Sequence, residues 1–154
     1  MKLNGRILYL AKDSEQLKLQ LSGKNIECPE DFHYGVNTDA MISGRACTLG
    51  YSTDILGPFF LENFQEVVDK DSIRTSGVQV IVGGDAYGSG SSREAAVVAH
   101  QGAGVELVVA RSFQRIFQEN MVYAGLPFTT DFSVLKRLES GEDLNLNSLY
   151  DQLP

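Results

Sequence analysis

The sequence is poor in cysteine and in basic residues, and each shortage excludes classes of protein. Its two cysteines, Cys28 and Cys47, are too few for a disulfide framework and are not spaced as a metal site. We expect both to be reduced, partly buried thiols. Lys and Arg number 13 against 20 Asp and Glu, which gives a net charge of −7. Because nucleic acids and anionic membranes bind basic surfaces, we expect neither as a partner.

Long apolar runs are also missing. No run approaches the roughly 20 residues that a membrane-spanning helix requires. The N-terminal stretch MKLNGRILYLAKD lacks the apolar centre of a signal peptide, so we expect a cytoplasmic protein. The chain does have 43% hydrophobic residues over 154 positions, and no segment has a disordered composition. This predicts one domain with a sizeable core.

The second half of the chain alternates apolar strands with helices. The predicted strands, all apolar, are 78–84, 105–110 and 126–132. The helix after the first strand is capped by Ser91 or Ser92 and runs to about Ala99. The next helix is capped by Ser112 and stops before Gly125. This order predicts an α/β fold with a parallel, right-handed βαβ unit.

The first half has a weaker pattern. Gly5–Ala11 is predicted to be a strand, and the alternation in LKLQL (17–21) predicts a second strand joined to it by a hairpin. Residues 26–57 have few periodic apolar positions and are expected to be a long loop, which in a compact domain is usually functional. A short helix is predicted over 58–68, with Pro58 in its first turn, and a last one over 134–140.

The loop GDAYGSGSSREAA (84–96) carries three serines and an Arg-Glu pair between a strand and a helix. It lacks the GxxxxGK[ST] and GxGxxG patterns of phosphate-binding loops. It also lacks the GxSxG spacing of a nucleophile elbow, because Gly88 and Gly90 flank Ser89 directly. The chain has only two histidines, His33 and His100, and we expect His100 to be a surface or half-buried helix residue.

Two interpretations of the loop remain open. In the first, the glycines allow the turn and the serines only cap the helix, which leaves the arginine unexplained. In the second, Ser91, Ser92 and Arg93 lie at a helix N-terminus that favours negative charge. Arg93 could then hold a carboxylate by two hydrogen bonds, and a serine alkoxide in the same field could act as a base. The predicted chemistry is proton abstraction next to a carboxylate.

Three segments together resemble the swivelling domain of the aconitase superfamily. They are YGSGSSRE (87–94), the downstream VELVVARSFQRIFQENMVYAGLP (105–127) and the upstream VNTDAMISGR (36–45). The pattern is most similar to the separate small subunits of isopropylmalate isomerases and homoaconitases. The resemblance implies a three-layer β/β/α swivelling domain over 1–154. It also implies a hydro-lyase that dehydrates and rehydrates a hydroxy di- or tricarboxylate, such as a malate derivative of leucine biosynthesis, with lysine or secondary metabolism left open.

The resemblance also implies roles for single residues. Ser91 matches the family's catalytic base, Ser92 a serine that hydrogen-bonds the substrate, and Arg93 the arginine that grips a substrate carboxylate. The segment ACTLGYSTD, which follows Arg45, corresponds to the loop that helps to select the substrate's side group in this family. Arg45 or Leu49 would make that selection here. The residues that organise the site are Thr38, Asp39, Gly88 and Gly90.

The same resemblance implies a partner. The family's [4Fe-4S] cluster is held by three cysteines of a large subunit, so this chain would bind no metal and would be inactive without that subunit. Self-association of the isolated chain is left open. The sequence departs from the family at Ala86, at Ala95 and in a hairpin or loop inserted over 12–35. Ala86 and Ala95 are the reason to keep an alternative to the hydro-lyase, a non-catalytic binding or regulatory module that retains the swivelling fold.

Overall fold

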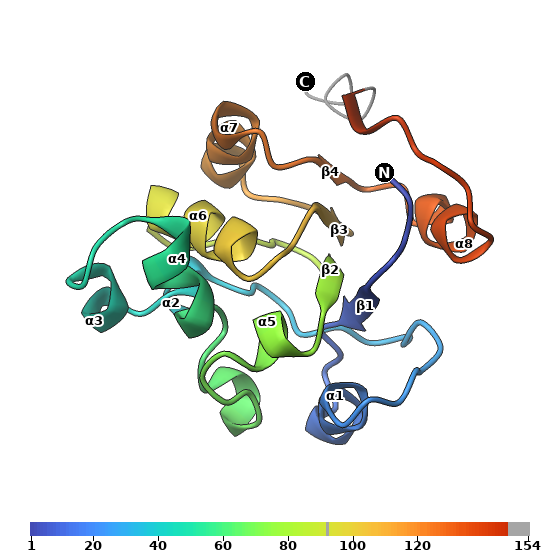
Figure 1. Ribbon diagram of the computed structural model, residues 1–154, viewed down its shortest axis with the longest axis horizontal. Helices are drawn as coiled ribbons and strands as arrows, with labels where there is room; N and C mark the ends of the chain where they lie inside the picture. Colours follow the sequence, from blue (N-terminus) through green and yellow to red (C-terminus); the bar gives the residue numbers. More distant parts are fainter. Residues whose placement is uncertain (92, 148–154) are drawn as a thin grey trace.

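A parallel sheet forms the centre of the computed structural model, which describes residues 1–91 and 93–147 (Figure 1). Its strands, in spatial as well as chain order, are β1 (Arg6–Tyr9), β2 (Val78–Gly83), β3 (Leu107–Ala110) and β4 (Phe128–Thr129). All three pairings are parallel. The predicted α/β class is confirmed, and each of the four apolar segments contributes its strand.

Helices cover both faces of this sheet. They are α1 (Ser14–Leu21), α2 (Thr38–Met41), α3 (Gly44–Cys47), α4 (Thr53–Leu56), α5 (Ser72–Thr75), α6 (Glu94–Gly102), α7 (Arg115–Ala124) and α8 (Ser133–Glu139), with 3₁₀ turns η1 (Gly57–Phe59) and η2 (Phe64–Glu66). In Figure 1, α6 and α7 lie on one side of the sheet and α8 on the other. Strand residues alternate between the faces, so that Ile81 packs with the α6 layer, whereas Val80 and Val82 pack with α8.

The prediction of a strand over 17–21 is wrong, because the segment lies in helix α1. The Asp13 side chain caps the helix by accepting a hydrogen bond from the Glu15 backbone nitrogen at 2.9 Å. Leu17 and Leu21 are four residues apart and pack on the same core. Gln20 is buried and pairs twice with the backbone of Tyr9, at 2.8 Å each, which satisfies the outer edge of β1.

The segment from 26 to 68 also differs from its prediction. The expected long loop contains the short helices α2, α3 and α4, and each begins after an asparagine or serine whose side chain caps it. The expected helix over 58–68 is instead the pair of turns η1 and η2. Phe60 and the adjacent Leu61 are both buried, and Leu61 has a left-handed φ of 57°. A left-handed φ inside the segment rules out one continuous α-helix over 58–68.

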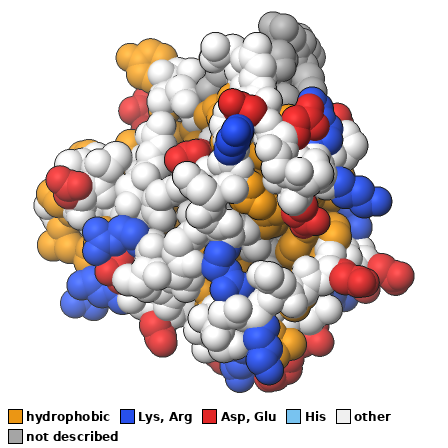
Figure 2. Space-filling view, turned by 45° about the vertical axis from the view of Figure 1, so that its right-hand side comes forward, with side chains coloured by type: hydrophobic (Ala, Val, Ile, Leu, Met, Phe, Trp, Pro, Cys, Tyr) orange, Lys and Arg blue, Asp and Glu red, His pale blue; other side chains and the backbone are white. Residues whose placement is uncertain are grey.

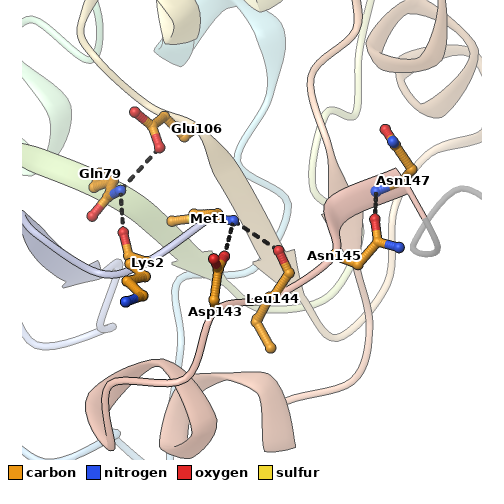
Figure 3. A network of polar contacts seen from close by, with 8 residues as sticks. All are labelled: Met1, Lys2, Gln79, Glu106, Asp143, Leu144, Asn145 and Asn147. Carbon is orange, nitrogen blue, oxygen red and sulfur yellow. Dashed lines mark hydrogen bonds and ion pairs between the residues drawn. The ribbon is translucent and has the colours of Figure 1, made fainter.

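The segment before β1 is held against the rest of the chain by a network of polar contacts (Figure 3). The Met1 amino group donates to Asp143 Oδ1 at 2.7 Å and to the Leu144 carbonyl at 2.8 Å. Gln79, buried on β2, donates from Nε2 to the Lys2 carbonyl at 3.0 Å and to Glu106 Oε2 at 2.9 Å. These contacts hold the segment before β1 against β2 and against the residues that follow α8.

The surface carries mixed charge. Figure 2 shows basic and acidic side chains interspersed over one face, with small apolar patches between them. Among the helices that the structure describes, none is both long and apolar enough to cross a membrane. The free thiols differ in exposure: Cys47 is half-buried as expected, whereas Cys28 is exposed, which corrects the prediction for that residue.

Candidate functional site

The loop between β2 and α6 crosses the carboxyl edge of the sheet, where parallel α/β sheets place their ligands. Three of its residues have left-handed φ values: Ala86 (58°), Gly88 (85°) and Gly90 (92°). A Cβ atom on Gly88 would collide with the ring of Phe117. The loop is therefore packed tightly onto α7 and can make its turn only because two of these residues are glycines.

A second segment, far away in sequence, runs beside this loop. Gly88 donates its backbone N–H to the Val36 carbonyl at 2.8 Å, and Thr38 donates its own to the Ser89 carbonyl at 3.0 Å. The Thr38 hydroxyl then donates to the carbonyl of Ser91 at 2.6 Å. Thr38 is only 1% exposed, so its polar side chain is held by the loop it organises. Thr38 therefore contacts the backbone of the loop, and the site-organising role expected for it stays a prediction.

Arg93 is the N-cap residue of α6 and faces the same second segment. Its Nη2 lies 2.8 Å from Asp39 Oδ1, and its Nη1 donates to the Ile42 carbonyl at 3.4 Å. The Arg93 side chain is 31% exposed and that of Asp39 is 66% exposed. Asp39 thus occupies one edge of the guanidinium while part of Arg93 stays accessible at a helix N-terminus, which favours negative charge.

Of the serines expected to cap helices, Ser91 and Ser112 do not do so. Within 1–91 and 93–147, no side chain caps α6, and Ser91 instead engages the Thr38 hydroxyl through its carbonyl. Ser92 lies outside the described residues. Helix α7 begins at Arg115 rather than after Ser112. The Ser112 hydroxyl accepts the N–H of Ala86 at 2.8 Å, so it supports the left-handed turn of the loop.

One hollow lies beside the start of α6, and another lies beside Gly88 and Gly90 of the loop. The larger, about 600 Å³, is lined by Gly44, Cys47, Tyr51, Arg93, Glu94, Ala95 and Val98. The smaller, about 430 Å³, is lined by Thr38, Gly88, Gly90, Gln114, Arg115, Ile116, Phe117 and Glu119. Both volumes suit a small organic anion. Arg93 belongs to the lining of the larger hollow, and the exposed Ser91 belongs to the lining of neither.

The two residues predicted to select the substrate's side group lie outside both hollows. Arg45 lies in α3 and Leu49 follows it; both are exposed, Leu49 by 59%. Neither belongs to the lining of the two hollows. Cys47 and Tyr51, from the same segment, do line the larger hollow, and nothing in the sequence separates them from their neighbours. Ala95 lies in that lining as well.

The prediction for His100 is wrong, because this residue is fully buried. Its Nε2 lies 2.6 Å from the hydroxyl of Tyr87, and its Nδ1 lies 2.6 Å from the Ala96 carbonyl. Burial lowers the pKa of His100 to about 4 and raises that of Tyr87, so both are neutral at pH 7. In the described part of the chain, no group of three His, Cys, Asp or Glu side chains could hold a metal ion.

Comparisons with known proteins agree with this geometry. The family model of the aconitase C-terminal domain matches residues 62–131. The 3-isopropylmalate dehydratase small subunit of Pyrobaculum calidifontis is 34% identical over 119 residues, which are 70% of this chain and 74% of that protein. The aconitase AMT8 of Alternaria alternata is 40% identical over 114 residues, 73% of this chain but 13% of that protein.

A solved structure is similar as well. The crystal structure of 3-isopropylmalate dehydratase (leuD) from Methanocaldococcus jannaschii has a TM-score of 0.51 and 37% sequence identity, and the match covers 63% of this chain and 56% of that one. The chain spans 66% of the small subunit of Pyrobaculum islandicum, to which it is 36% identical. The share of a relative's own length that this chain spans therefore ranges from 13% to 74% among these proteins.

The fold and the site together define an α/β domain that presents a serine and an arginine at the carboxyl edge of a parallel sheet. The chain belongs to the family of the 3-isopropylmalate dehydratase small subunits, and its residues 62–131 match the aconitase C-terminal domain. The resemblance drawn from residues 36–45 and 87–127 is thereby confirmed.

Proposed function

We propose that this chain is the small subunit of a heteromeric hydro-lyase of the isopropylmalate dehydratase type. Its substrate would be a hydroxy dicarboxylate or tricarboxylate, isomerised by removal and return of water. The observation that carries the proposal is the position of Arg93, which lines a hollow of about 600 Å³ at a helix N-terminus, two residues from Ser91. The small-subunit relatives support the same reaction class.

Each residue of the turn has a distinct task in this proposal. Arg93 receives a substrate carboxylate by two parallel hydrogen bonds on the part of its guanidinium that Asp39 leaves open. The Ser91 oxygen then takes the proton from the carbon next to that carboxylate, since the helix N-terminus and Arg93 stabilise its anionic form. Ser92 adds a hydrogen bond to the substrate. Thr38 holds the Ser91 backbone in place.

The hydroxyl of the substrate has to leave with help from another group. Within the described residues, the half-buried Cys47 and the exposed Cys28 belong to no group that could hold a metal, and three thiolates are needed for the family's cluster. These residues do not fit an iron–sulfur cluster, so we place it on a large subunit. The active form is then a heteromer, for which we propose the cytoplasm as compartment and leucine biosynthesis as the first pathway to examine.

Copurification with a large subunit tests the proposal. The chain is coexpressed with a candidate large subunit that carries three cluster cysteines, and the purified complex is assayed on alkylmalates, citrate and homocitrate analogues. We expect a stable complex and turnover of at least one of these substrates. A stable complex without turnover of any substrate would favour the non-catalytic binding module instead.

A further inference from the structure

Tyr87 and His100 form a polar pair in the middle of the core, and neither has an assigned role. Both side chains are 0% exposed. Since the Ala96 carbonyl can only accept, His100 carries its proton on Nδ1. Nε2 is then an acceptor, and the Tyr87 hydroxyl donates to it at 2.6 Å. The pair is neutral, and each of its hydrogen-bonding groups has a partner.

The pair joins the two elements that carry the proposed site. Tyr87 lies in the loop four residues before Ser91, and His100 lies on α6, the helix whose N-terminus holds Arg93. The backbone of Tyr87 is also fixed, because its N–H donates to the Ser112 carbonyl and its carbonyl accepts from Gln114, both at 3.0 Å. The loop is therefore anchored to α6 by a side chain and to the start of α7 by its backbone.

Aromatic side chains pack around Tyr87 and His100 and restrict the geometry of the pair. The His100 ring lies 4.3 Å from the Phe60 ring and 5.8 Å from the Phe117 ring, measured between centroids. Phe117 is the same side chain that blocks any Cβ on Gly88. A fully satisfied polar pair inside such a cluster specifies one arrangement of the elements it connects. Displacement of Tyr87 would move Gly88 against Phe117 and shift the whole turn that follows.

We propose that Tyr87 and His100 are positioning residues, which hold the loop that bears Ser91 against helix α6 and so set the distance between Ser91 and Arg93. This inference rests on the proposed function. It assigns no contact with the substrate to either side chain. Its consequence is that loss of the Tyr87 hydroxyl lowers turnover while substrate affinity changes little, because a displaced base slows the chemical step.

Amide hydrogen exchange of the isolated chain tests the pair without any activity. Tyr87→Phe removes the hydroxyl and keeps the ring. We expect exchange at the Gly88 and Thr38 amides to rise about tenfold or more, while amides of β2, such as that of Val82, stay within about twofold of wild type. Tyr123→Phe is the matched control, because Tyr123 is 89% exposed on α7. Unchanged exchange at Gly88 in the Tyr87→Phe variant would overturn the proposal.

Turnover of the complex with a large subunit tests the positioning role itself. Tyr87→Phe and His100→Leu are expected to lower kcat about 10- to 100-fold with KM within about twofold. His100→Gln, which keeps a donor and an acceptor, should recover much of kcat. Wild-type kcat in Tyr87→Phe would overturn the positioning role, even if thermal stability falls. A wild-type complex without turnover would refute the proposed function, and the exchange experiment would then decide alone whether the pair orders the loop.

Discussion

The hydroxyl of Thr38 donates a 2.6 Å hydrogen bond to the backbone carbonyl of Ser91, across 53 residues of sequence. One residue after Thr38 and two residues after Ser91, the two segments meet again in the Asp39–Arg93 ion pair. Helix α2 therefore holds the loop of the proposed site at two successive points. Thr38 binds the Ser91 backbone, and Asp39 binds the Arg93 side chain.

Removal of the Thr38 hydroxyl should destabilise the fold, because its hydrogen bond to the Ser91 carbonyl is lost. We expect Thr38→Val to lower the free energy of unfolding by about 1 kcal/mol, the usual net value of one hydrogen bond. Thr38→Ser keeps the donor and is the matched control. Urea denaturation of the two variants measures the difference. Equal stability of Thr38→Val and wild type would show that the contact contributes nothing to the fold.

Two glycines in the loop should respond differently to alanine. Gly88→Ala meets both a left-handed φ of 85° and a collision with Phe117, so we expect a loss of about 3 kcal/mol or more. Gly90→Ala meets only the φ of 92°, since the nearest atom to its Cβ is 3.5 Å away, and should cost about 1 kcal/mol. Thermal melts of both variants check this order. A reversed order would contradict the packing of Gly88 on Phe117.

Acid should destabilise the protein through His100. Its pKa is about 4 in the folded chain, against 6.5 ordinarily, because burial disfavours the charged ring. Below pH 6.5 the unfolded chain takes up a proton that the folded chain does not, so the free energy of unfolding falls as the pH drops towards 4. The fall from this group is about 3 kcal/mol. His33, whose pKa burial also lowers, acts in the same direction.

Urea denaturation at a series of pH values between 7.5 and 4.5 measures this effect. His100→Gln carries no titrating ring and should show a clearly smaller loss of stability over that range. The carboxyl group of Asp131, whose pKa is lowered by hydrogen bonds from Ser133, affects stability at lower pH and does not obscure the comparison. Equal slopes for wild type and His100→Gln would contradict the neutral, buried state of His100.

The arginine of the site should not tolerate lysine. Arg93→Lys keeps the charge but loses the planar pair of donors, so we expect KM of the complex to rise about 10- to 100-fold. Arg74→Lys is the matched control, since Arg74 pairs with Asp71 through two hydrogen bonds on α5, away from the loop. It should leave KM unchanged. An unaltered KM in Arg93→Lys would mean that this guanidinium does not hold the substrate carboxylate.

The parts of the fold that the sequence predicted correctly depend on local patterns. The apolar runs around Val80 and Val108 have no helical period, and Gly125 ends α7 in the left-handed conformation expected of it. The segment LKLQL satisfies two periods at once, because Leu17 and Leu21 suit a strand face as well as a helix face. The cap from Asp13 and the burial of Gln20 decide in favour of the helix, and burial of an amide cannot be predicted from periodicity.

The sequence predicts which types of residue form the candidate site, but it does not predict the contacts between them. Ser91 and Arg93 are only two residues apart in YGSGSSRE, so their shared position could be inferred. Thr38 and Asp39 join them only through tertiary pairing, which a single sequence does not reveal. The role of His100 was missed because a histidine in a helix is usually exposed. The proposed single domain and the insertion over 12–35 remain predictions.

Turnover of the Ser91→Ala variant tests the central claim most directly. The variant is assembled with the large subunit that supports wild-type activity, and Ser140→Ala, a serine at the end of α8, is assembled as control. We expect kcat to fall about 10³-fold or more in Ser91→Ala, since general-base catalysis typically contributes 10²–10⁴, while KM and the control stay close to wild type. Turnover of Ser91→Ala near the wild-type rate would contradict the account.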